Sequence, residues 1–137
     1  MIKIRAYADS DYEDVKLNLE EGHLFHPEDS SSNFRAKIER NHGSIIVAET
    51  EGHAVGNIFI YRHPENIPTA SLWSLAVRRA CRKQGIGSLL LSDSESRLRK
   101  EGIKEAVIMP EREDLREYYI KRGYVPSGHP QFMYKIL

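Results

Sequence analysis

The start of the chain alternates apolar and polar positions with two different periods, which predicts a strand followed by a helix. Residues 2–6 alternate at every second position and predict the strand. Ser10 and Glu13 form a capping-box pattern, so we expect the helix to begin there. Val15 and Leu19 are spaced to share one helix face and should point into the core.

The next segment contains a polar stretch and then two apolar runs. Residues 20–32 are polar and include a glycine and a proline, which predicts a loop before a short helix over residues 33–41. Residues 44–50 and 53–61 are rich in Ile, Val and Phe. The Glu-Gly pair between them favours a two-residue turn, so the two runs predict a β-hairpin.

A near-continuous apolar run over residues 70–77 predicts a central strand that is buried on both faces. A helix should follow it after a glycine-containing turn and should end at Gly102. Glu95 and Arg99 are expected to form an exposed ion pair on this helix. The positions expected on its buried side are Ile86, Leu89, Leu90 and Leu98.

The last third of the chain predicts a strand over residues 105–109, a helix that stops at Gly123, and two short final strands. Because one helix joins strand 70–77 to strand 105–109, these strands should be parallel. The pattern therefore predicts an α/β (α+β) fold with a mixed sheet of roughly six to seven strands and about four helices, antiparallel in its N-terminal half. Strand 132–137 would offer an edge through which a homodimer could form.

Composition narrows the class of protein. With 137 residues, the chain is expected to form a single domain over residues 1–137. Twenty Lys and Arg balance twenty Asp and Glu, so the net charge favours neither nucleic acid nor a membrane surface as a partner. Cys81 is the only cysteine, which excludes an internal disulfide and a multi-cysteine metal site. Without an apolar leader or spanning segment, the sequence predicts a cytoplasmic protein that needs no metal.

The most informative stretch follows strand 70–77, where a basic turn leads into the helix with the spacing Arg82-x-x-Gly85-x-Gly87. Two glycines allow a tight turn with exposed amides, and the helix N-terminus adds its positive dipole end. Arg78, Arg79 and Lys83 bring further positive charge. This combination predicts a site for a pyrophosphate-bearing cofactor. The spacing fits neither a P-loop nor a dinucleotide-binding GxGxxG motif.

The glycine spacing resembles the cofactor loop of the GNAT superfamily, the acyl-CoA-dependent N-acyltransferases. The segment Tyr118-Tyr119-Ile120-Lys121-Arg122-Gly123-Tyr124 resembles a second motif of that family and follows the loop after one helix and one strand. The resemblance implies the GNAT fold and acetyl-CoA as co-substrate. It implies that the pyrophosphate is held by the loop residues Arg82, Lys83, Gln84, Gly85, Ile86, Gly87 and Ser88. It further implies that the backbone of Leu75, Ala76 and Val77 pairs with the pantetheine arm and stabilises the oxyanion.

The implied chemistry is direct attack of an amine on a thioester through a tetrahedral intermediate, with the CoA thiolate leaving. Tyr119 falls on the family's tyrosine, and a phenol of pKa near 10 can protonate a thiolate whose thiol has a pKa near 8.5. Neighbouring Tyr118 and Tyr119 should point in different directions from the helix, one to the core and one to the cleft, and we assign Tyr119 to the cleft. Strand 70–77 carries no general base. The candidates elsewhere are Glu20, Glu21, His23, His26, Glu28, Glu49, His53 and His63, or an ordered water.

These inferences predict an N-acetyltransferase that acts on a primary amine of a small molecule or of a protein N-terminus or lysine. Acidic residues at positions 20, 21, 28 and 29 would attract a cationic acceptor. Two alternatives stay open: a non-catalytic acyl-CoA-binding or sensing module, and a nucleotide-binding module that uses the loop for ATP or a dinucleotide. Cys81 could form an acyl-enzyme, but direct transfer is the preferred interpretation because no Cys/His/Asn pattern accompanies it.

Overall fold

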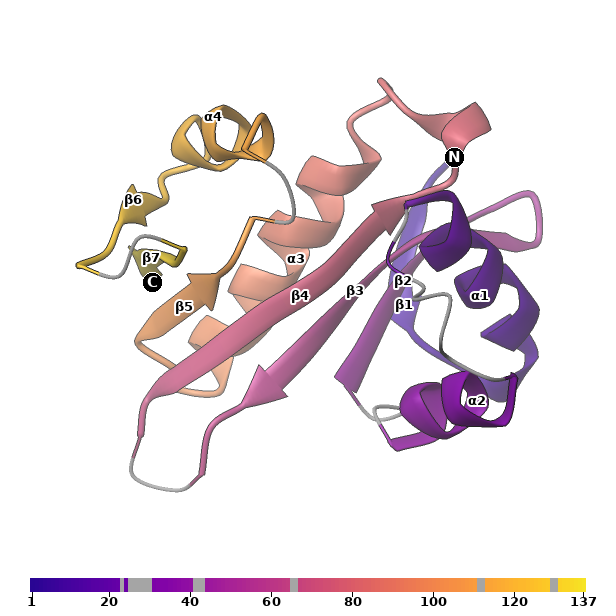
Figure 1. The fold of residues 1–137 in the computed structure, drawn as a ribbon, viewed down its shortest axis with the longest axis horizontal. Helices are drawn as coiled ribbons and strands as arrows, with labels where there is room; N and C mark the ends of the chain where they lie inside the picture. The colour runs from indigo at the N-terminus through magenta and orange to yellow at the C-terminus, as the bar shows by residue number, and fades with distance from the viewer. Residues whose placement is uncertain (23, 25–30, 41–43, 65–66, 111–112, 129–130) are drawn as a thin grey trace. The chain divides into compact units, whose positions relative to one another are not determined.

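The computed structural model describes residues 1–22, 24, 31–40, 44–64, 67–110, 113–128 and 131–137. In this part of the chain, seven strands are joined in the order β1-β2-β3-β4-β5-β7-β6 (Figure 1). The strands are β1 (Lys3–Ala6), β2 (Ile45–Thr50), β3 (His53–Arg62), β4 (Thr69–Val77), β5 (Glu105–Ile108), β6 (Val125–Pro126) and β7 (Met133–Ile136). The α-helices are α1 (Tyr12–Glu21), α2 (Ser31–Arg40), α3 (Ile86–Lys100) and α4 (Leu115–Ile120).

The pairing directions confirm the predicted mixed sheet. β1 with β2, β2 with β3, β5 with β7, and β6 with β7 are antiparallel, whereas β4 and β5 are parallel. The helix α3 joins the two parallel strands, as the crossover rule requires.

The chain forms two compact units. The first comprises Met1–Ile60 and Ser74–Ser94, and the second comprises Tyr61–Trp73 and Glu95–Leu137. Strand β4 and helix α3 each run from one unit into the other. That residues 1–137 act as a single domain stays a prediction.

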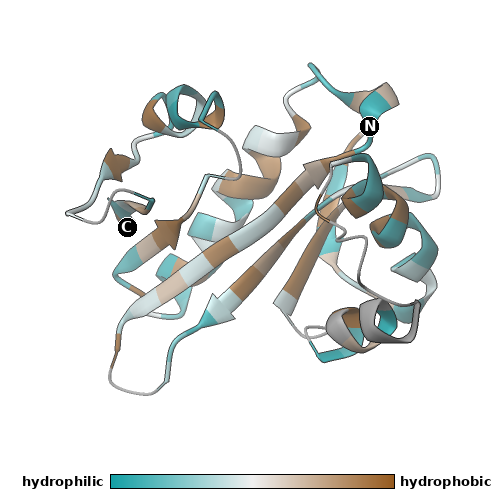
Figure 2. Cartoon of the chain, viewed as in Figure 1, coloured by the Kyte–Doolittle hydropathy of each residue, from teal (hydrophilic) through white to brown (hydrophobic). Residues whose placement is uncertain are grey.

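In the first unit, the β2–β3 hairpin forms as predicted. Glu51 and Gly52 make its turn with φ angles of 52° and 80°, the left-handed conformation that such turns need. Helices α1 and α2 cover one face of β1–β3, and the first half of α3 lies on the other (Figure 1). Figure 2 shows apolar residues concentrated along β2 and β3 between these layers. The strand buried throughout its middle, from Ala54 to Ile60, is therefore β3.

The prediction that residues 70–77 are buried on both faces is wrong. β4 does lie fourth among the seven strands, but its residues alternate between buried and half-buried. Ala70, Leu72, Ser74 and Ala76 form its buried face. Its long apolar run reflects a half-covered strand whose outer positions also carry apolar side chains.

Helix α1 begins later than its capping-box pattern suggests. A 3-10 turn over Asp9–Asp11 precedes it, and the helix starts at Tyr12 without a side-chain cap. Asp11 instead accepts hydrogen bonds from the Ala8 amide at 2.8 Å and from Arg5 at 2.8 and 2.9 Å. This ion pair fixes the chain where β1 turns into the helix. Val15 is buried, as predicted.

Helix α3 forms as predicted, but Leu89 and Glu95 have the opposite exposure to the one expected. Leu89 is 44% exposed, and Leu91 is buried in its place. Glu95 is only 4% exposed and does not form the expected surface pair with Arg99. The buried stripe repeats at three- and four-residue intervals from Ile86, and that spacing brings position 95 inside.

In the second unit, β7 is not the edge strand that was expected. It pairs with β5 on one side and with β6 on the other. β6 is only two residues long and occupies the outer position, where it pairs with Met133 and Tyr134 and so covers the first half of the outer edge of β7.

Candidate functional site

The loop between β4 and α3 has the geometry of an anion-binding turn. Lys83 and Gly85 have φ angles of 66° and 79°, and α3 begins at the next residue, Ile86. The Leu89 amide donates to the Gly85 carbonyl at 3.0 Å, so helical bonding starts there. The amides of the first helical turn have no intrahelical acceptor and point out of the helix end. A Cβ at Gly85 would meet no atom within 4 Å, so open space lies in front of this turn.

The start of α3 is packed closely on the sheet at Gly56. A Cβ at this position would lie 3.1 Å from Ile86 Cγ2, 3.1 Å from Leu90 Cδ1 and 3.2 Å from the Ala76 carbonyl oxygen. The absence of a side chain at this position of β3 thus lets the helix lie close to β3. Ile86 is buried there, while its amide belongs to the exposed turn.

The four cations of the loop have different roles. Arg78 turns toward α1, where its guanidinium donates to Asp14 Oδ1 at 3.0 Å and to Asn18 Oδ1 at 3.1 Å. The Arg78 side chain therefore points toward α1 and does not contribute its charge to the surface of the turn, unlike Arg79, Arg82 and Lys83. Arg82 donates to the carbonyls of Val77 at 3.0 Å and Glu21 at 3.3 Å, which ties the turn to the end of β4.

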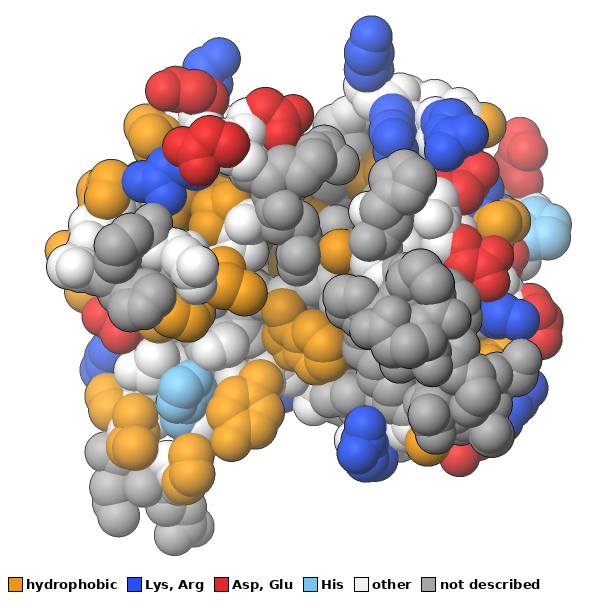
Figure 3. Space-filling model, viewed as in Figure 1, with side chains coloured by type: hydrophobic (Ala, Val, Ile, Leu, Met, Phe, Trp, Pro, Cys, Tyr) orange, Lys and Arg blue, Asp and Glu red, His pale blue; other side chains and the backbone are white. Residues whose placement is uncertain are grey.

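Arg79 and Lys83 are exposed on this turn, and Lys and Arg side chains gather over the end of β4 (Figure 3). Glu21 Oε1 accepts a hydrogen bond from the Arg79 amide at 3.0 Å. A positively charged surface thus adjoins the open space at Gly85, and this fits an anionic ligand.

The middle of β4 contains a feature that the sequence did not predict. Ser74 has a φ of 51°, which is rare for a residue with a side chain, and it lies in the middle of a strand. Its carbonyl accepts a hydrogen bond from Asn57 Nδ2 at 2.9 Å. Asn57 itself is fully buried within the apolar run of β3. The only sign of this contact in the sequence is the polar Asn57 side chain within an apolar run. A buried side-chain amide needs a specific hydrogen-bond partner.

The second unit places Tyr119 among aromatic rings. Its ring packs edge-to-face against Tyr118, with centroids 5.2 Å apart, and against Tyr124, with centroids 5.9 Å apart. Tyr119 is 4% exposed, whereas Tyr118 is half-buried beneath the Arg122 guanidinium. The two neighbouring tyrosines therefore have different environments, but Tyr119 is the buried one and Tyr118 the partly exposed one, which is the reverse of the predicted cleft and core sides.

Tyr124 is held by a buried acidic group. Its hydroxyl donates to Glu95 Oε2 at 2.9 Å, and Lys135 Nζ donates to Glu95 Oε1 at 3.0 Å. Burial, and then the adjacent Glu95 carboxylate, raise the pKa of Tyr124 well above its usual value. This arrangement fixes the ring against which Tyr119 packs.

Comparison with known proteins identifies the family. The Acetyltransferase (GNAT) family model matches residues 8–124 of this chain. The chain belongs to the GNAT acetyltransferase family. A curated relative, L-2,4-diaminobutyric acid acetyltransferase of Nocardia farcinica, is 34% identical over 71 residues. That match covers 50% of this chain and only 37% of the relative.

Solved structures confirm the GNAT fold. N-acetylglutamate synthase from Neisseria gonorrhoeae, complexed with coenzyme A and N-acetyl-glutamate, matches with a TM-score of 0.78 at 17% identity, covering 100% of this chain and 35% of that protein. PaiA N-acetyltransferase from Thermoplasma acidophilum, in complex with coenzyme A, has a TM-score of 0.73 at 19% identity; the match covers 100% of this chain and 99% of that protein. A GNAT family acetyltransferase from Brucella melitensis, in complex with acetyl-CoA, has a TM-score of 0.72 at 17% identity; the match covers 100% of this chain and 88% of that protein.

Among the described residues, most candidates for the general base of this GNAT chain are bound to other groups. Glu49 Oε1 accepts a hydrogen bond from Arg5 Nε at 2.6 Å. His53 Nδ1 lies 3.4 Å from Asp14 Oδ2, and His63 Nε2 lies 3.0 Å from Ser71 Oγ. Glu20 and Glu21 lie on the last turn of α1. His23, His26 and Glu28 lie outside the described residues.

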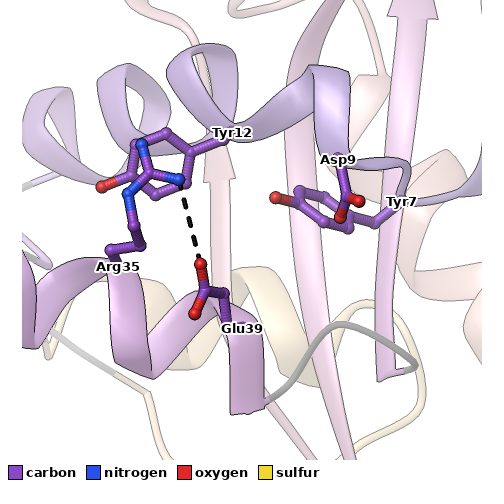
Figure 4. Close-up of a pocket in the computed structure, with 5 residues that line it drawn as sticks. All are labelled: Tyr7, Asp9, Tyr12, Arg35 and Glu39. Atoms are coloured by element: carbon purple, nitrogen blue, oxygen red, sulfur yellow. Dashed lines mark ion pairs between the residues drawn. The ribbon is translucent and has the colours of Figure 1, made fainter.

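A separate cavity of about 570 Å³ lies between α1 and α2, lined by Tyr7, Asp9, Tyr12, Arg35 and Glu39 (Figure 4). The Arg35 guanidinium stacks over the Tyr12 ring at 3.8 Å and faces Glu39 at 3.9 Å. The Arg35–Tyr12 contact joins the two helices, whereas Arg35 and Glu39 both lie on α2. The cavity is lined by none of the residues of the glycine loop.

Neither a metal-binding cluster nor a membrane-spanning helix is found among the described residues. No three His, Cys, Asp or Glu side chains among them come together as a metal site would require. None of the helices found there has the length and apolar content needed to cross a membrane. Cys81 is a half-buried free thiol in the turn Arg79–Cys81.

Proposed function

We propose that this chain transfers the acetyl group of acetyl-CoA to a primary amine. The observation that carries the proposal is the turn at Gly85, where left-handed backbone, open space and the N-terminus of a fifteen-residue helix coincide. Such a turn binds phosphate groups through backbone amides. Family membership and the neighbours that hold coenzyme A or acetyl-CoA support this choice of ligand.

The residues present fit the pyrophosphate of that co-substrate. The amides of the turn would donate to its oxygens, and Lys83 would add charge from the exposed side. Arg82 would contribute while bracing the turn, since its two named bonds use only two of the five N–H donors of a guanidinium. The residues proposed to contact the co-substrate in this loop are Arg82, Lys83, Gln84, Gly85, Ile86, Gly87 and Ser88.

Leu75, Ala76 and Val77 are proposed to hold the pantetheine arm by backbone hydrogen bonds, as an added strand would be held. Bound acetyl-CoA supplies a thioester carbonyl that an unprotonated amine can attack. An amide of this segment would donate to the acyl oxygen and so favour the charge that develops there.

Tyr119 is proposed as the general acid for the departing thiolate. Its position in the motif supports this role, and its packing between two tyrosines restricts the directions in which its hydroxyl can point. A fixed phenol can hold a proton at one place and keep bulk water away from it.

The acceptor is proposed to be a cationic primary amine, either a small molecule or a protein N-terminus or lysine. The similarity to a diaminobutyric acid acetyltransferase supports an amino-acid-like amine. We propose that residues 1–137 act as one domain in the cytoplasm, in keeping with the single cysteine and the balanced charge.

Calorimetric titration of the purified protein with acetyl-CoA, CoA and ATP tests the binding site. We expect micromolar binding of acetyl-CoA that Gly85→Glu abolishes. Gly102→Glu is the matched control, because Gly102 also has a positive φ, 83°, and open space at its Cβ position but lies at the other end of α3. Absence of acetyl-CoA binding, a preference for ATP, or equal loss in both variants would refute the assignment.

Turnover is then measured by CoA release with a panel of cationic, uncharged and acidic amines. Tyr119→Phe should lower kcat at least tenfold while the Kd for acetyl-CoA stays nearly constant. Tyr118→Phe is the control from the adjacent position and should keep kcat. Binding without turnover of any amine would favour the sensing module instead. Reaction of uncharged amines alone would contradict a cationic acceptor.

A further inference from the structure

A continuous chain of hydrogen bonds runs through the first unit from α1 to the end of β4. Asn18 and Asn57 form its centre, and both are fully buried, with 0% exposure. Asn18 Nδ2 donates to Asn57 Oδ1 at 3.1 Å and to the Ala54 carbonyl at 3.0 Å. Asn57 Nδ2 donates to the Ser74 carbonyl at 2.9 Å. Buried amides of this kind are retained only with well-matched partners.

Arg78 sets the direction of every bond in this chain. A guanidinium can only donate, so its Nε at 3.1 Å requires the oxygen of Asn18 on that side. The Asn18 amide nitrogen then faces Asn57 and requires its oxygen. The Asn57 nitrogen is consequently left to face the carbonyl of Ser74. Asp14 holds Arg78 in place, with its Oδ1 3.0 Å from Nη2.

The two ends of the chain enclose the segment Leu75, Ala76 and Val77. At one end Ser74 is held in its left-handed conformation, with a φ of 51°, and its carbonyl is bound by Asn57. At the other end the Arg78 amide donates to the Val55 carbonyl at 2.7 Å, and its side chain returns to Asn18. A residue with a side chain adopts this φ only when its surroundings impose it.

We propose that Asn57, oriented by Asn18 and Arg78, is a positioning residue that holds the kink at Ser74 and thereby aims the backbone of residues 75–77 at the thioester arm. This inference rests on the proposed function for its ligand. The kink itself is a property of the free protein. The network acts through backbone direction and touches no reacting atom.

We call the hydrogen-bonded set of Arg78, Asn18, Asn57 and Ser74 the clamp. Hydrogen exchange of the 75–77 amides in the free protein tests whether the clamp holds this segment in the absence of any ligand. Asn18→Asp is the primary variant, because its carboxylate can still accept from Arg78 but no longer orients Asn57. We expect these amides to exchange about tenfold faster, the effect of one lost buried hydrogen bond. Ser94→Ala is the matched control: it removes the buried bond from Ser94 Oγ to the Leu90 carbonyl, 2.8 Å long, at another place in the same unit. Equal exchange at 75–77 in wild type and Asn18→Asp would overturn the proposal.

A rescue experiment separates positioning from general stability. Asn57→Ala should raise the Kd for acetyl-CoA about tenfold by calorimetry. Adding Ser74→Gly should restore much of the affinity, since glycine adopts a positive φ without strain. Adding Ser74→Ala, which removes the same hydroxyl but keeps the strain, should not. Equal affinities of the two double variants would overturn the role assigned to the kink.

The two experiments also distinguish this inference from the proposed function. If wild-type protein binds no acetyl-CoA, the proposed function fails, and exchange at 75–77 still decides whether the clamp exists. If wild type binds and exchange in Asn18→Asp is unchanged, the clamp fails alone. Should Asn57→Ala not fold, Asn18→Asp is titrated with acetyl-CoA in its place. A tenfold weaker Kd, with Ser94→Ala binding as wild type does, supports the proposal, and an unchanged Kd refutes it.

Discussion

A single methyl group added at Gly56 should loosen the start of α3 and disturb the glycine turn that precedes it, where we propose that the co-substrate binds. The new Cβ would lie 3.1 Å from both Ile86 Cγ2 and Leu90 Cδ1, and 3.2 Å from the Ala76 carbonyl oxygen. Carbon atoms in ordinary contact are about 3.5 to 4.0 Å apart, so these groups must retreat by roughly half an ångström. Ile86 is the first residue of α3, and its retreat moves the turn that begins the helix.

The magnitude follows from two opposing effects. Overpacking of a filled core costs about 1 to 3 kcal/mol. Alanine in a strand is favoured over glycine by about 0.5 to 1 kcal/mol because it loses less chain entropy on folding. We therefore expect Gly56→Ala to lower the free energy of unfolding by ~1 kcal/mol at the midpoints of these ranges and by at most ~2.5 kcal/mol. The midpoint corresponds to a fall of ~4 °C in Tm for a chain of this size.

The assay combines thermal unfolding with calorimetric titration of acetyl-CoA. Gly128→Ala is the control, since a Cβ there would meet nothing within 4 Å and the backbone has no positive φ. It should leave Tm and Kd unchanged or raise Tm slightly. In Gly56→Ala, Ile86→Leu should recover part of the loss, because leucine lacks the Cγ2 methyl. If Gly56→Ala matches Gly128→Ala in both measurements, the close approach of α3 does not constrain the loop.

Three further predictions concern ionisable groups. Because the pKa of Tyr124 is raised in the folded state, the stability it contributes is present below its unfolded value of 10.0 and is lost above it, so Tyr124→Phe should flatten the fall in unfolding free energy between about pH 10 and 12. Lys135→Met leaves the buried Glu95 carboxylate without its cation and should cost about 3 to 5 kcal/mol in urea unfolding, whereas an exposed lysine changed to methionine should cost little. Burial raises the pKa of Asp11, but the bonds from Arg5 and the Ala8 amide outweigh this and leave it below 3.8, so its contribution is present above that pH and is lost in acid; Asp11→Asn should flatten the acid limb of the stability curve.

Several elements could be predicted from local sequence because their causes are local. The turn of the β2–β3 hairpin depends on left-handed backbone at two adjacent residues, which Gly52 adopts without strain and which the two-residue turn imposes on Glu51. The beginning of α3 and its preceding turn depend on Gly85 and on the periodicity of the following apolar residues. The order of strands and helices then limits the pairing of β4 with β5 to the parallel direction.

Other features could not be predicted because they depend on partners far apart in the chain. Glu95 looked like half of a surface pair until the fold brought Tyr124 and Lys135 to it. Arg78 looked equivalent to Arg82, and only the position of α1 turned it away from the loop. Likewise, the two residues of β6 pair with the first two residues of β7, and no sequence pattern predicts so short a strand.

The sequence alone determined the family, the fold class and the place of the glycine turn before α3, since glycines, helix ends and apolar periods act over a few neighbouring residues. Only the tertiary structure decided how the end of β4 is shaped. The left-handed angle at Ser74 opposes that residue's own preference and is held by an amide from β3, which is itself oriented from α1 and Arg78. A conformation imposed by distant hydrogen bonds leaves no trace in the local pattern, because the residue that adopts it is not the residue that causes it.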